Sequence, residues 1–162
     1  MERSGWEIYS TISKISGCRL TIIEKSLYQK IVKSIPILCI DLIIVYDKKY
    51  LLVKRNENPL KGEWWVPGGR VLLGETIEQT AKRKLEEEIG IKLDSYMKVE
   101  GIYEDFFDNS SMGDHLYHTL SIVFKIEIDN IDNIKLDSTS NNWALRCTLP
   151  KRFKSNLEVF NG

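Results

Sequence analysis

The strongest hydrophobic pattern along this chain lies between residues 76 and 89. Four side chains recur there at spacings of four, four and three residues, which places them on one face of a helix: Ile77, Ala81, Leu85 and Glu88. Gly90 follows as a typical C-terminal stop. The pattern predicts a helix over residues 76–89 that carries an acidic side chain, Glu88, beside its apolar stripe.

Two apolar runs before this helix predict a β-hairpin. Residues 37–46 are strongly apolar except for Asp41, and residues 50–55 return after a polar turn at residues 47–49. An ionised Asp inside an apolar strand costs free energy, so Asp41 is a candidate for a functional residue. The structural alternative is an Asp near a strand end that bonds to a turn.

Further elements are predicted on both sides of the helix. Residues 27–32 suggest a short amphipathic helix. Residues 99–107 and 116–128 predict two strands joined by a polar loop at 108–114, and residues 143–149 predict a final strand. Several strands around one strong helix predict a single-domain α+β fold.

Three adjacent acids, Glu86 to Glu88, stand at the C-terminal end of the predicted helix. The helix dipole is negative there, so each acid costs about 0.3–1 kcal/mol unless it is compensated. A divalent cation would compensate the acids, because hard cations such as Mg²⁺ take carboxylate and carbonyl oxygens and then hold phosphates. The alternative is a solvated helix in which Lys84 pairs with Glu88 and Arg83 pairs with Glu87.

The segment around the helix also matches a known pattern. Residues 69–91 read G-x5-E-x7-R-K-L-x-E-E-x-G-I. This resembles the Nudix box of the Nudix hydrolases, except that Lys84 stands where the box has a Glu. The resemblance implies a mixed sheet sandwiched between helices, with the box forming loop, helix and loop. It places a Nudix-like domain at residues 27–150, between an N-terminal extension (1–26) and a polar tail (151–162).

Composition narrows the set of partners. The chain has 162 residues with 23 Lys and Arg against 23 Asp and Glu, and this balance argues against binding nucleic acid through bulk charge. The three cysteines have no metal-ligand spacing, which suits a reducing compartment. Charges interrupt every apolar stretch near the N-terminus, so neither a signal peptide nor a membrane span is expected. The sequence therefore predicts a cytoplasmic protein.

The sequence around the box narrows the resemblance to one Nudix subfamily. GDP-mannose mannosyl hydrolases also lack the acid that Lys84 replaces, and they are similar to this chain in residues 27–36, 39–42, 53–55, 62–70 and 103–118. This resemblance implies hydrolysis of GDP-mannose to GDP and mannose by attack at the sugar carbon, with Mg²⁺ as cofactor and Mn²⁺ as an alternative. It also implies a homodimer, whose interface the residues before Leu27 would enlarge.

The resemblance assigns roles to individual residues. The Gly68 carbonyl and Glu88 match metal ligands, and Glu87 is a candidate for a second carboxylate ligand with a catalytic role. Arg55 and Arg70 match catalytic residues that hold the diphosphate of the substrate. Arginine suits this task because its planar guanidinium group bonds phosphate oxygens in pairs.

Two further positions concern the substrate and the catalytic base. Asp41 matches a position that contacts the substrate. The subfamily carries a Gln ligand and a His base in a late loop, which here corresponds to residues 136–143 and contains neither. Without a base, attack at carbon should be slower by about 10²–10⁴-fold.

The chain has two histidines, His115 and His118, which are three residues apart on a strand and so point to opposite faces. One of them could therefore face the site, and His118 is the candidate for a substitute base, ahead of Glu104 and Asp105. The structural alternative for each histidine is a strand or loop residue without a chemical role.

Three functions therefore stay open. The first is the hydrolysis of GDP-mannose at carbon, which the flanking resemblance and Lys84 favour. The second is cleavage of a pyrophosphate to a nucleoside monophosphate and a phosphorylated product, which the missing late-loop His favours. The third is a non-catalytic nucleotide-binding regulator, against which the intact Gly68, Glu87 and Glu88 argue.

Overall fold

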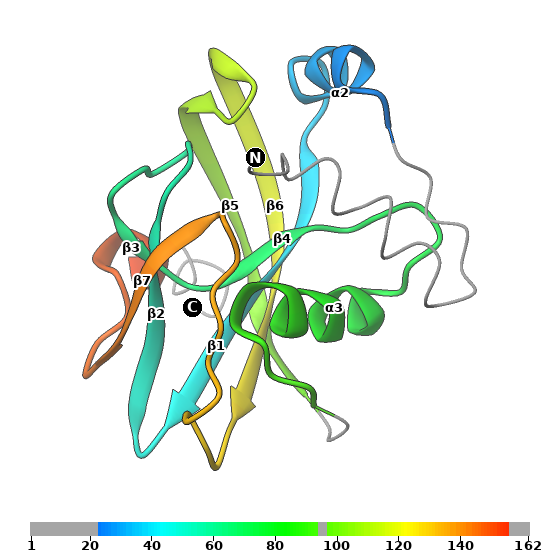
Figure 1. The fold of residues 1–162 in the computed structure, drawn as a ribbon. Helices are drawn as coiled ribbons and strands as arrows, with labels where there is room; N and C mark the ends of the chain where they lie inside the picture. The colour runs from blue at the N-terminus through cyan, green and yellow to red at the C-terminus, as the bar shows by residue number, and fades with distance from the viewer. Residues whose placement is uncertain (1–22, 94–96, 156–162) are drawn as a thin grey trace, which may run out of the picture.

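The protein is represented by a computed structural model that describes residues 23–93 and 97–155 (Figure 1). Its elements follow one another in this order: α2 (Lys25–Val32), β1 (Ile37–Tyr46), β2 (Lys49–Arg55), β3 (Trp64–Trp65), β4 (Gly68–Arg70), α3 (Ile77–Ile89), β5 (Lys98–Ser110), β6 (Gly113–Glu127) and β7 (Ser140–Arg146). Residues 151–155 form a short helix at the C-terminal end. Most of the predicted N-terminal extension, up to residue 22, lies outside the described residues, and so do residues 156–162 of the predicted tail.

The strands form one mixed sheet in the order β3-β2-β1-β6-β5. β1 runs parallel to β6, whereas its pairings with β2 and β4 are antiparallel. β1 changes partner along its length, because residues 44–46 pair with β2 and residues 39–41 pair with β4. β2 and β4 therefore diverge from the same edge of β1. The predicted single-domain α+β fold with a mixed sheet is confirmed.

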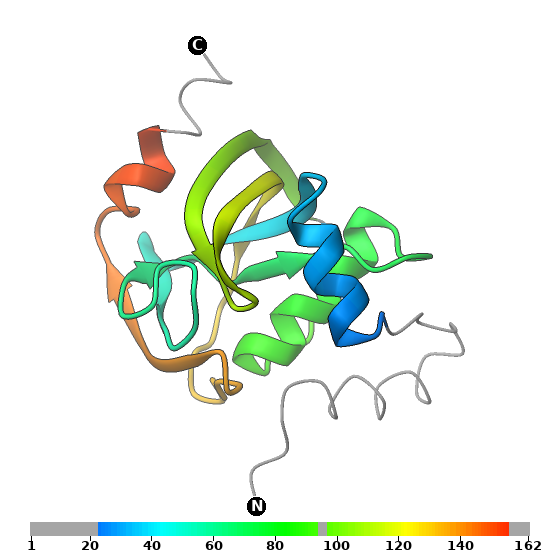
Figure 2. The same ribbon diagram turned by 90° about the horizontal axis from the view of Figure 1, so that it is seen from above.

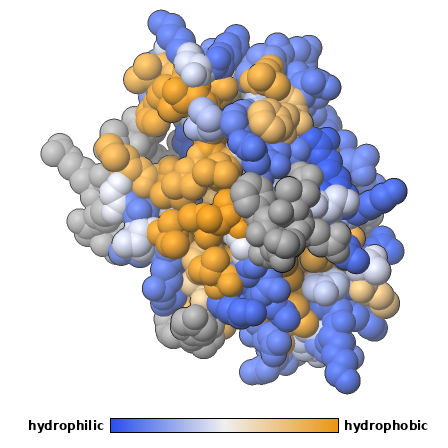
Figure 3. Space-filling model, turned by 180° about the vertical axis from the view of Figure 1, so that it is seen from behind, coloured by the Kyte–Doolittle hydropathy of each residue, from blue (hydrophilic) through white to orange (hydrophobic). Residues whose placement is uncertain are grey.

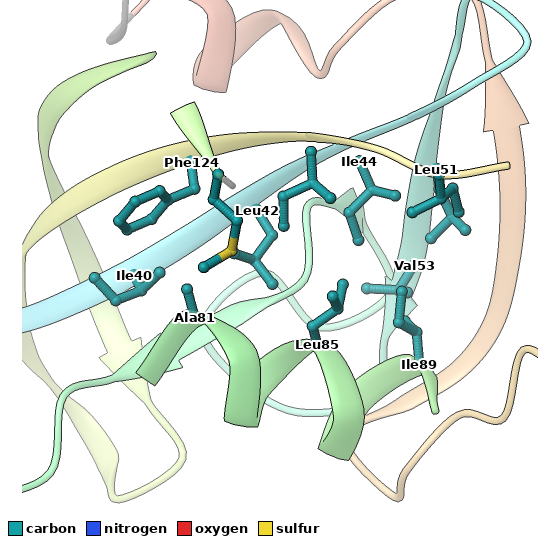
Figure 4. Close-up of a cluster of buried hydrophobic side chains, with 12 residues drawn as sticks. Ile40, Leu42, Ile44, Leu51, Val53, Ala81, Leu85, Ile89 and Phe124 are labelled. Carbon is teal, nitrogen blue, oxygen red and sulfur yellow. The ribbon is translucent and has the colours of Figure 1, made fainter. Parts of the chain in front are cut away.

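The long helix α3 forms where the hydrophobic pattern predicts it. Thr76 and Gln79 build a capping box at its start, and Gly90 ends it in the left-handed conformation with a φ of 76°. Ile77 is 37% exposed, since it lies in the first turn beyond the edge of the core. The rest of the apolar stripe packs against the sheet (Figure 4) and consists of Ala81, Leu85 and Ile89.

Two of the strand predictions need correction. The hairpin of β1 and β2 is confirmed, but the loop predicted at residues 108–114 is wrong. β5 continues to Ser110 and β6 begins at Gly113, so the turn between them is much shorter. Residues in this part of the hairpin are polar because they are largely exposed, and not because the strands have ended.

The final strand lies three residues earlier than the predicted 143–149. β7 spans Ser140–Arg146 and pairs with β2, and the last pair of the ladder joins Arg146 to Tyr50. β2 itself begins at Lys49. Because the two strands are antiparallel, β7 ends beside the first residues of β2. The sequence of β7 alone does not predict this end.

The C-terminal helix covers the face of the sheet opposite α3 (Figure 2). Its residue Phe153 is fully buried and packs edge-on against Trp65 and Tyr103, with ring centroids 5.5 Å and 4.9 Å away. Residues 151–155, which the sequence analysis assigns to a polar tail, therefore form a helix that Phe153 attaches to the core. A single aromatic residue among polar neighbours gives little periodic signal, although it anchors this segment to the core.

A band of apolar residues crosses the back of the molecule (Figure 3). Large apolar side chains are exposed on the outer side of β1, β5 and β6, and we call the following five residues the outer patch: Leu38, Ile102, Phe106, Leu116 and Leu120. Exposed apolar groups gathered on one sheet face are typical of interaction surfaces.

No helix within residues 23–93 and 97–155 is long and apolar enough to cross a membrane.

We predict that Phe153→Ala lowers the free energy of unfolding by about 3–5 kcal/mol, because it leaves a cavity between two aromatic rings. Urea unfolding followed by tryptophan fluorescence measures this change. The control is Leu73→Ala, since Leu73 is 76% exposed and its loss should change stability by less than about 0.5 kcal/mol. Equal stability of the Phe153→Ala variant and the unmodified protein would contradict the assignment of this helix to the core.

Candidate active site

Glu88 joins the end of α3 to the start of β4. Its Oε2 atom accepts a hydrogen bond from the Gly68 backbone amide at 3.1 Å, and its side chain is only 7% exposed. Gly68 lies so close to β1 that an added Cβ would stand 2.3 Å from the Ile40 carbonyl oxygen and 2.3 Å from Asp41 Oδ1. The structure thus brings Gly68 and Glu88 together, and only a glycine fits at residue 68.

Arg83 ties α3 to the loop before it and to β4. Its Nε lies 2.6 Å from Glu75 Oε1, and its second terminal nitrogen donates to Glu75 Oε2 at 2.8 Å and to the Arg70 carbonyl at 3.2 Å. Its other terminal nitrogen lies 3.0 Å from Glu87 Oε2. Burial alone would raise the pKa of Glu75, but the bonds from Arg83 outweigh it and the pKa lies below its usual value. These bonds orient the Glu87 side chain.

Lys84 lies among the same carboxylates. Its Nζ is 2.9 Å from Glu88 Oε1 and 3.3 Å from Glu87 Oε2, and its side chain is 6% exposed. The sequence alternative of a solvated helix therefore named the right partners for Lys84 and Arg83 but the wrong environment. Both ion pairs are largely buried, because β4 covers this side of the helix.

Asp41 is buried in a polar network on the side of the sheet that faces Phe153. The Tyr103 hydroxyl donates to Asp41 Oδ2 at 2.6 Å, and Ser121 also bonds this carboxyl group. Burial raises the pKa of Asp41 to about 6, although these two hydrogen bonds and the charge of Arg55 oppose the rise. The partners of Asp41 come from β5 and β6, so the alternative of a bond to a turn is wrong.

The two predicted arginines reach the same group of side chains from different strands. Arg55, at the end of β2, donates from Nε to the Pro59 carbonyl at 2.7 Å, and its charge acts on both Asp41 and Tyr117. Arg70, in β4, places its guanidinium carbon 4.1 Å from the centre of the Tyr28 ring. Arg55 and Arg70 therefore lie on the same side of the site as Asp41 and Gly68, which pair across β1 and β4.

His118 is not brought together with these residues. It points to the outer side of β6, because its neighbour Thr119 is buried on the side of Asp41 and alternate residues of a strand face opposite ways. Its Nε2 lies 2.7 Å from Glu104 Oε1, and its ring stacks on Phe106. These contacts account for His118 without a catalytic role.

The late loop lies next to the end of β2. Asn56 donates its backbone amide to the Thr139 carbonyl at 2.8 Å and its side-chain amide to the Ser138 carbonyl at 3.2 Å. Ser140 pairs with Arg55. The segment that corresponds to the Gln- and His-bearing loop of the subfamily is therefore beside Arg55. Its polar side chains are hydroxyl and amide groups and the carboxylate of Asp137.

Several residues of the site were missed by the sequence analysis. Tyr103 and Ser121 surround Asp41, and Tyr28 and Tyr117 flank the two arginines. The alternation along β6 contains the relevant signal, because polar residues recur at every second position and are followed by the apolar Val123 on the same face. A strand that places hydroxyl groups on a buried face indicates a polar site at that face.

The carboxylates of α3 fit a hard divalent cation. Glu87 Oε1 is buried and has no hydrogen-bond partner within residues 23–93 and 97–155, so a buried acceptor is left for an external group. Carboxylate oxygens from Glu87 and Glu88, with the nearby Gly68 backbone, are the donor type that Mg²⁺ and Mn²⁺ prefer. Over the same described part of the chain, no group of three or more His, Cys, Asp or Glu side chains is arranged as a complete metal site.

Comparison with known proteins agrees with this geometry. Residues 39–143, more than half of the chain, match the family described as NUDIX domain. The chain belongs to the Nudix family. Its Nudix box, residues 69–91, is therefore the loop and helix that follow Gly68 and carry Glu87 and Glu88, and the protein is a Nudix hydrolase by family.

Relatives of this Nudix chain include proteins from archaea. It is 33% identical over 112 residues to low-salt glycan biosynthesis protein Agl8 of Haloferax volcanii, covering 68% of this chain and 70% of that protein. It is 38% identical over 93 residues to an ADP-ribose pyrophosphatase of Methanocaldococcus jannaschii, covering 57% of this chain and 52% of that protein. The solved structure of a MutT protein from Methanosarcina mazei Go1 has the same fold, with a TM-score of 0.63 and 23% identity over 79% of this chain and 95% of that one.

We predict that Asp41→Asn removes a pH dependence of stability. The pKa of Asp41 is raised from 3.8 to about 6 in the folded protein, so the unfolded chain loses this proton first. The free energy of unfolding should therefore fall by about 3 kcal/mol as pH rises from about 4 to about 6, and stay lower above pH 6.

Urea unfolding in EDTA at four pH values between 4 and 7 tests this prediction. The difference in stability between the Asp41→Asn variant and the unmodified protein should grow in favour of the variant across that range. Parallel curves for the two proteins would show that Asp41 titrates normally in the fold.

Proposed function

We propose that this Nudix protein is a divalent-metal-dependent hydrolase of a nucleoside-diphosphate sugar, with GDP-mannose as the first candidate substrate. The proposal rests on one observation, that acidic and basic side chains of the site lie close together beside β4. The acids Glu87 and Glu88 lie on one side of this strand, and Arg55 and Arg70 lie on the other. Carboxylates bind divalent cations, and arginines bind phosphate groups. The two kinds of side chain together fit a metal-bound diphosphate substrate.

Different residues of the site would bind the metal ion and the diphosphate. Glu87, Glu88 and the Gly68 carbonyl would hold the Mg²⁺ or Mn²⁺ ion, which supplies positive charge to the phosphate oxygens when it is bound. Arg55 and Arg70 would bind the diphosphate and stabilise the charge that develops on the leaving group.

The buried polar network would contact the rest of the substrate. The hydroxyl group of Tyr103 fixes Asp41, which pairs with Gly68 across β1 and β4. The carboxyl group of Asp41 would accept hydrogen bonds from hydroxyl or amino groups of the substrate. The names of the two archaeal relatives support this substrate class, since one protein acts in glycan biosynthesis and the other on ADP-ribose, itself a nucleoside-diphosphate sugar.

The position of His118 favours a second candidate reaction. Attack at the sugar carbon needs a base near the substrate, and His118 lies on the outer side of β6 with Glu104 and Phe106. Cleavage of the pyrophosphate bond, giving a nucleoside monophosphate and a sugar phosphate, does not depend on that histidine. The flanking sequence and Lys84 favour the first reaction, and the site geometry favours the second.

Phosphorus NMR in ¹⁸O-labelled water distinguishes these reactions. Purified protein with Mg²⁺ and GDP-mannose is expected to yield products, and ADP-ribose serves as a second substrate. GDP without the label would mean attack at carbon, whereas ¹⁸O in GMP or in mannose 1-phosphate would mean attack at phosphorus.

The control for this experiment is Glu88→Gln, which removes a proposed ligand and should lower the rate by at least about 10²-fold. Equal rates for both proteins would identify a contaminating enzyme. Binding of both nucleotides without any product would contradict the proposal and support a non-catalytic regulator.

We also propose that the protein is a cytoplasmic homodimer and binds no nucleic acid. The outer patch supports the dimer, because an isologous contact would cover the apolar side chains of both copies at once. Glu104 and His118 lie within this surface, where Glu104 Oε1 is 2.7 Å from His118 Nε2. A contact of the patch with itself would bury these apolar side chains in both copies.

Light scattering with size-exclusion chromatography tests the dimer. The unmodified protein should elute with twice the mass of one chain, and Phe106→Glu should give monomers because it buries a charge in the interface. Leu73→Glu is the control, since Leu73 is exposed outside the patch. A monomeric unmodified protein would contradict the proposal.

A further inference from the structure

We propose that Lys84 is a built-in cation that occupies the position of one metal ion at the Glu87–Glu88 pair and so lowers the number of divalent ions that the site binds. This inference rests on the proposed metal binding of these acids. It assigns to Lys84 a role that differs from an ordinary ion pair on a helix surface, because Lys84 contacts the two carboxylates proposed as metal ligands.

The ammonium group of Lys84 contacts both acids at once. Lys84 Nζ lies between the side chains of Glu87 and Glu88, 3.3 Å from an oxygen of one and 2.9 Å from an oxygen of the other. All three side chains are at least 85% buried, with exposures of 6%, 15% and 7%. The ammonium group thus takes up one oxygen of each of the two acids that would hold a divalent ion.

Packing against β4 holds Lys84 in this place. A Cβ added to Gly69 would stand 2.5 Å from Lys84 Cε and 3.2 Å from its Nζ. The end of the lysine side chain therefore lies directly against the backbone of β4. The ammonium group cannot move away from the acids on the side of β4 unless that strand shifts.

The ion-paired side chains around Lys84 carry an excess of negative charge. The carboxylates of Glu75, Glu87 and Glu88 face the cations of Arg83 and Lys84, so three negative charges meet two positive ones. One negative charge remains, and Glu87 Oε1 is the buried acceptor that is left without a hydrogen-bond partner in the described structure. The cluster is therefore suited to one further cation, and a second would meet the repulsion of Lys84.

Titration with Mn²⁺ tests this role, with free Mn²⁺ followed by electron paramagnetic resonance and heats followed by calorimetry. Lys84→Met removes the charge and keeps much of the side-chain length, so Mn²⁺ should bind at least about tenfold more tightly. Lys84→Glu adds a carboxylate and should raise the number of bound ions above that of the unmodified protein. Lys84→Arg keeps the charge and should leave the number unchanged.

Lys82→Met is the matched control, because Lys82 lies on the same helix and pairs with Glu78 at the exposed surface. It should bind Mn²⁺ as the unmodified protein does. Thermal unfolding provides a second measurement, since Lys84→Met should be less stable than the unmodified protein in EDTA and should gain more stability from Mn²⁺.

The outcomes separate this inference from the proposed function. Unchanged affinity and number of ions in Lys84→Met and Lys84→Glu would overturn the role of Lys84 and leave metal-dependent hydrolysis intact. Binding of Mn²⁺ only after Lys84 is replaced would support the inference and contradict metal dependence of the natural protein. Absence of binding in every variant would overturn both.

Discussion

Buried ion pairs hold β4 against α3, and the arrangement of the site depends on them. Arg83 bonds Glu75, Glu87 and the Arg70 carbonyl, so one guanidinium group connects the loop, the helix and the strand. Loss of one partner from such a buried set leaves an uncompensated charge and costs about 3–5 kcal/mol. The positions of Gly68 and Arg70 in β4 relative to Glu87 and Glu88 in α3 follow from this attachment.

The two faces of the sheet carry different parts of the site, an apolar core under α3 and a polar network around Asp41. On one face, the stripe of α3 packs on alternate residues of β1 (Figure 4). On the other face, Asp41 and Tyr103 bond each other above Phe153. Because β1 pairs with β2 along one part and with β4 along another, groups from both faces meet at its edge. This is how Glu88 of α3 comes close enough to Asp41 to affect its pKa.

Features that depend on a few neighbouring residues could be predicted from the sequence. The limits of α3 follow from its capping box, its spacing of apolar residues and Gly90. The hairpin of β1 and β2 follows from two apolar runs around a short turn. The acids at the end of α3 also suggested a cation from local electrostatics alone.

Features set by distant contacts could not be predicted. The environment of Lys84 depends on β4, the pairing of Asp41 with Tyr103 depends on β5, and the burial of Phe153 depends on Trp65. The end of β7 depends on where β2 begins. His118 shows the same limit, because strand alternation says that neighbours face opposite ways but does not say which face carries the site.

The central claim is that one divalent ion binds to the acids of α3 while the arginines hold a diphosphate. The most direct measurement is anomalous diffraction from crystals of the protein soaked with Mn²⁺ and GDP. The account predicts a manganese peak beside Glu87 and Glu88, with the diphosphate of GDP in contact with Arg55 and Arg70. A manganese peak elsewhere, or GDP bound away from both arginines, would contradict it.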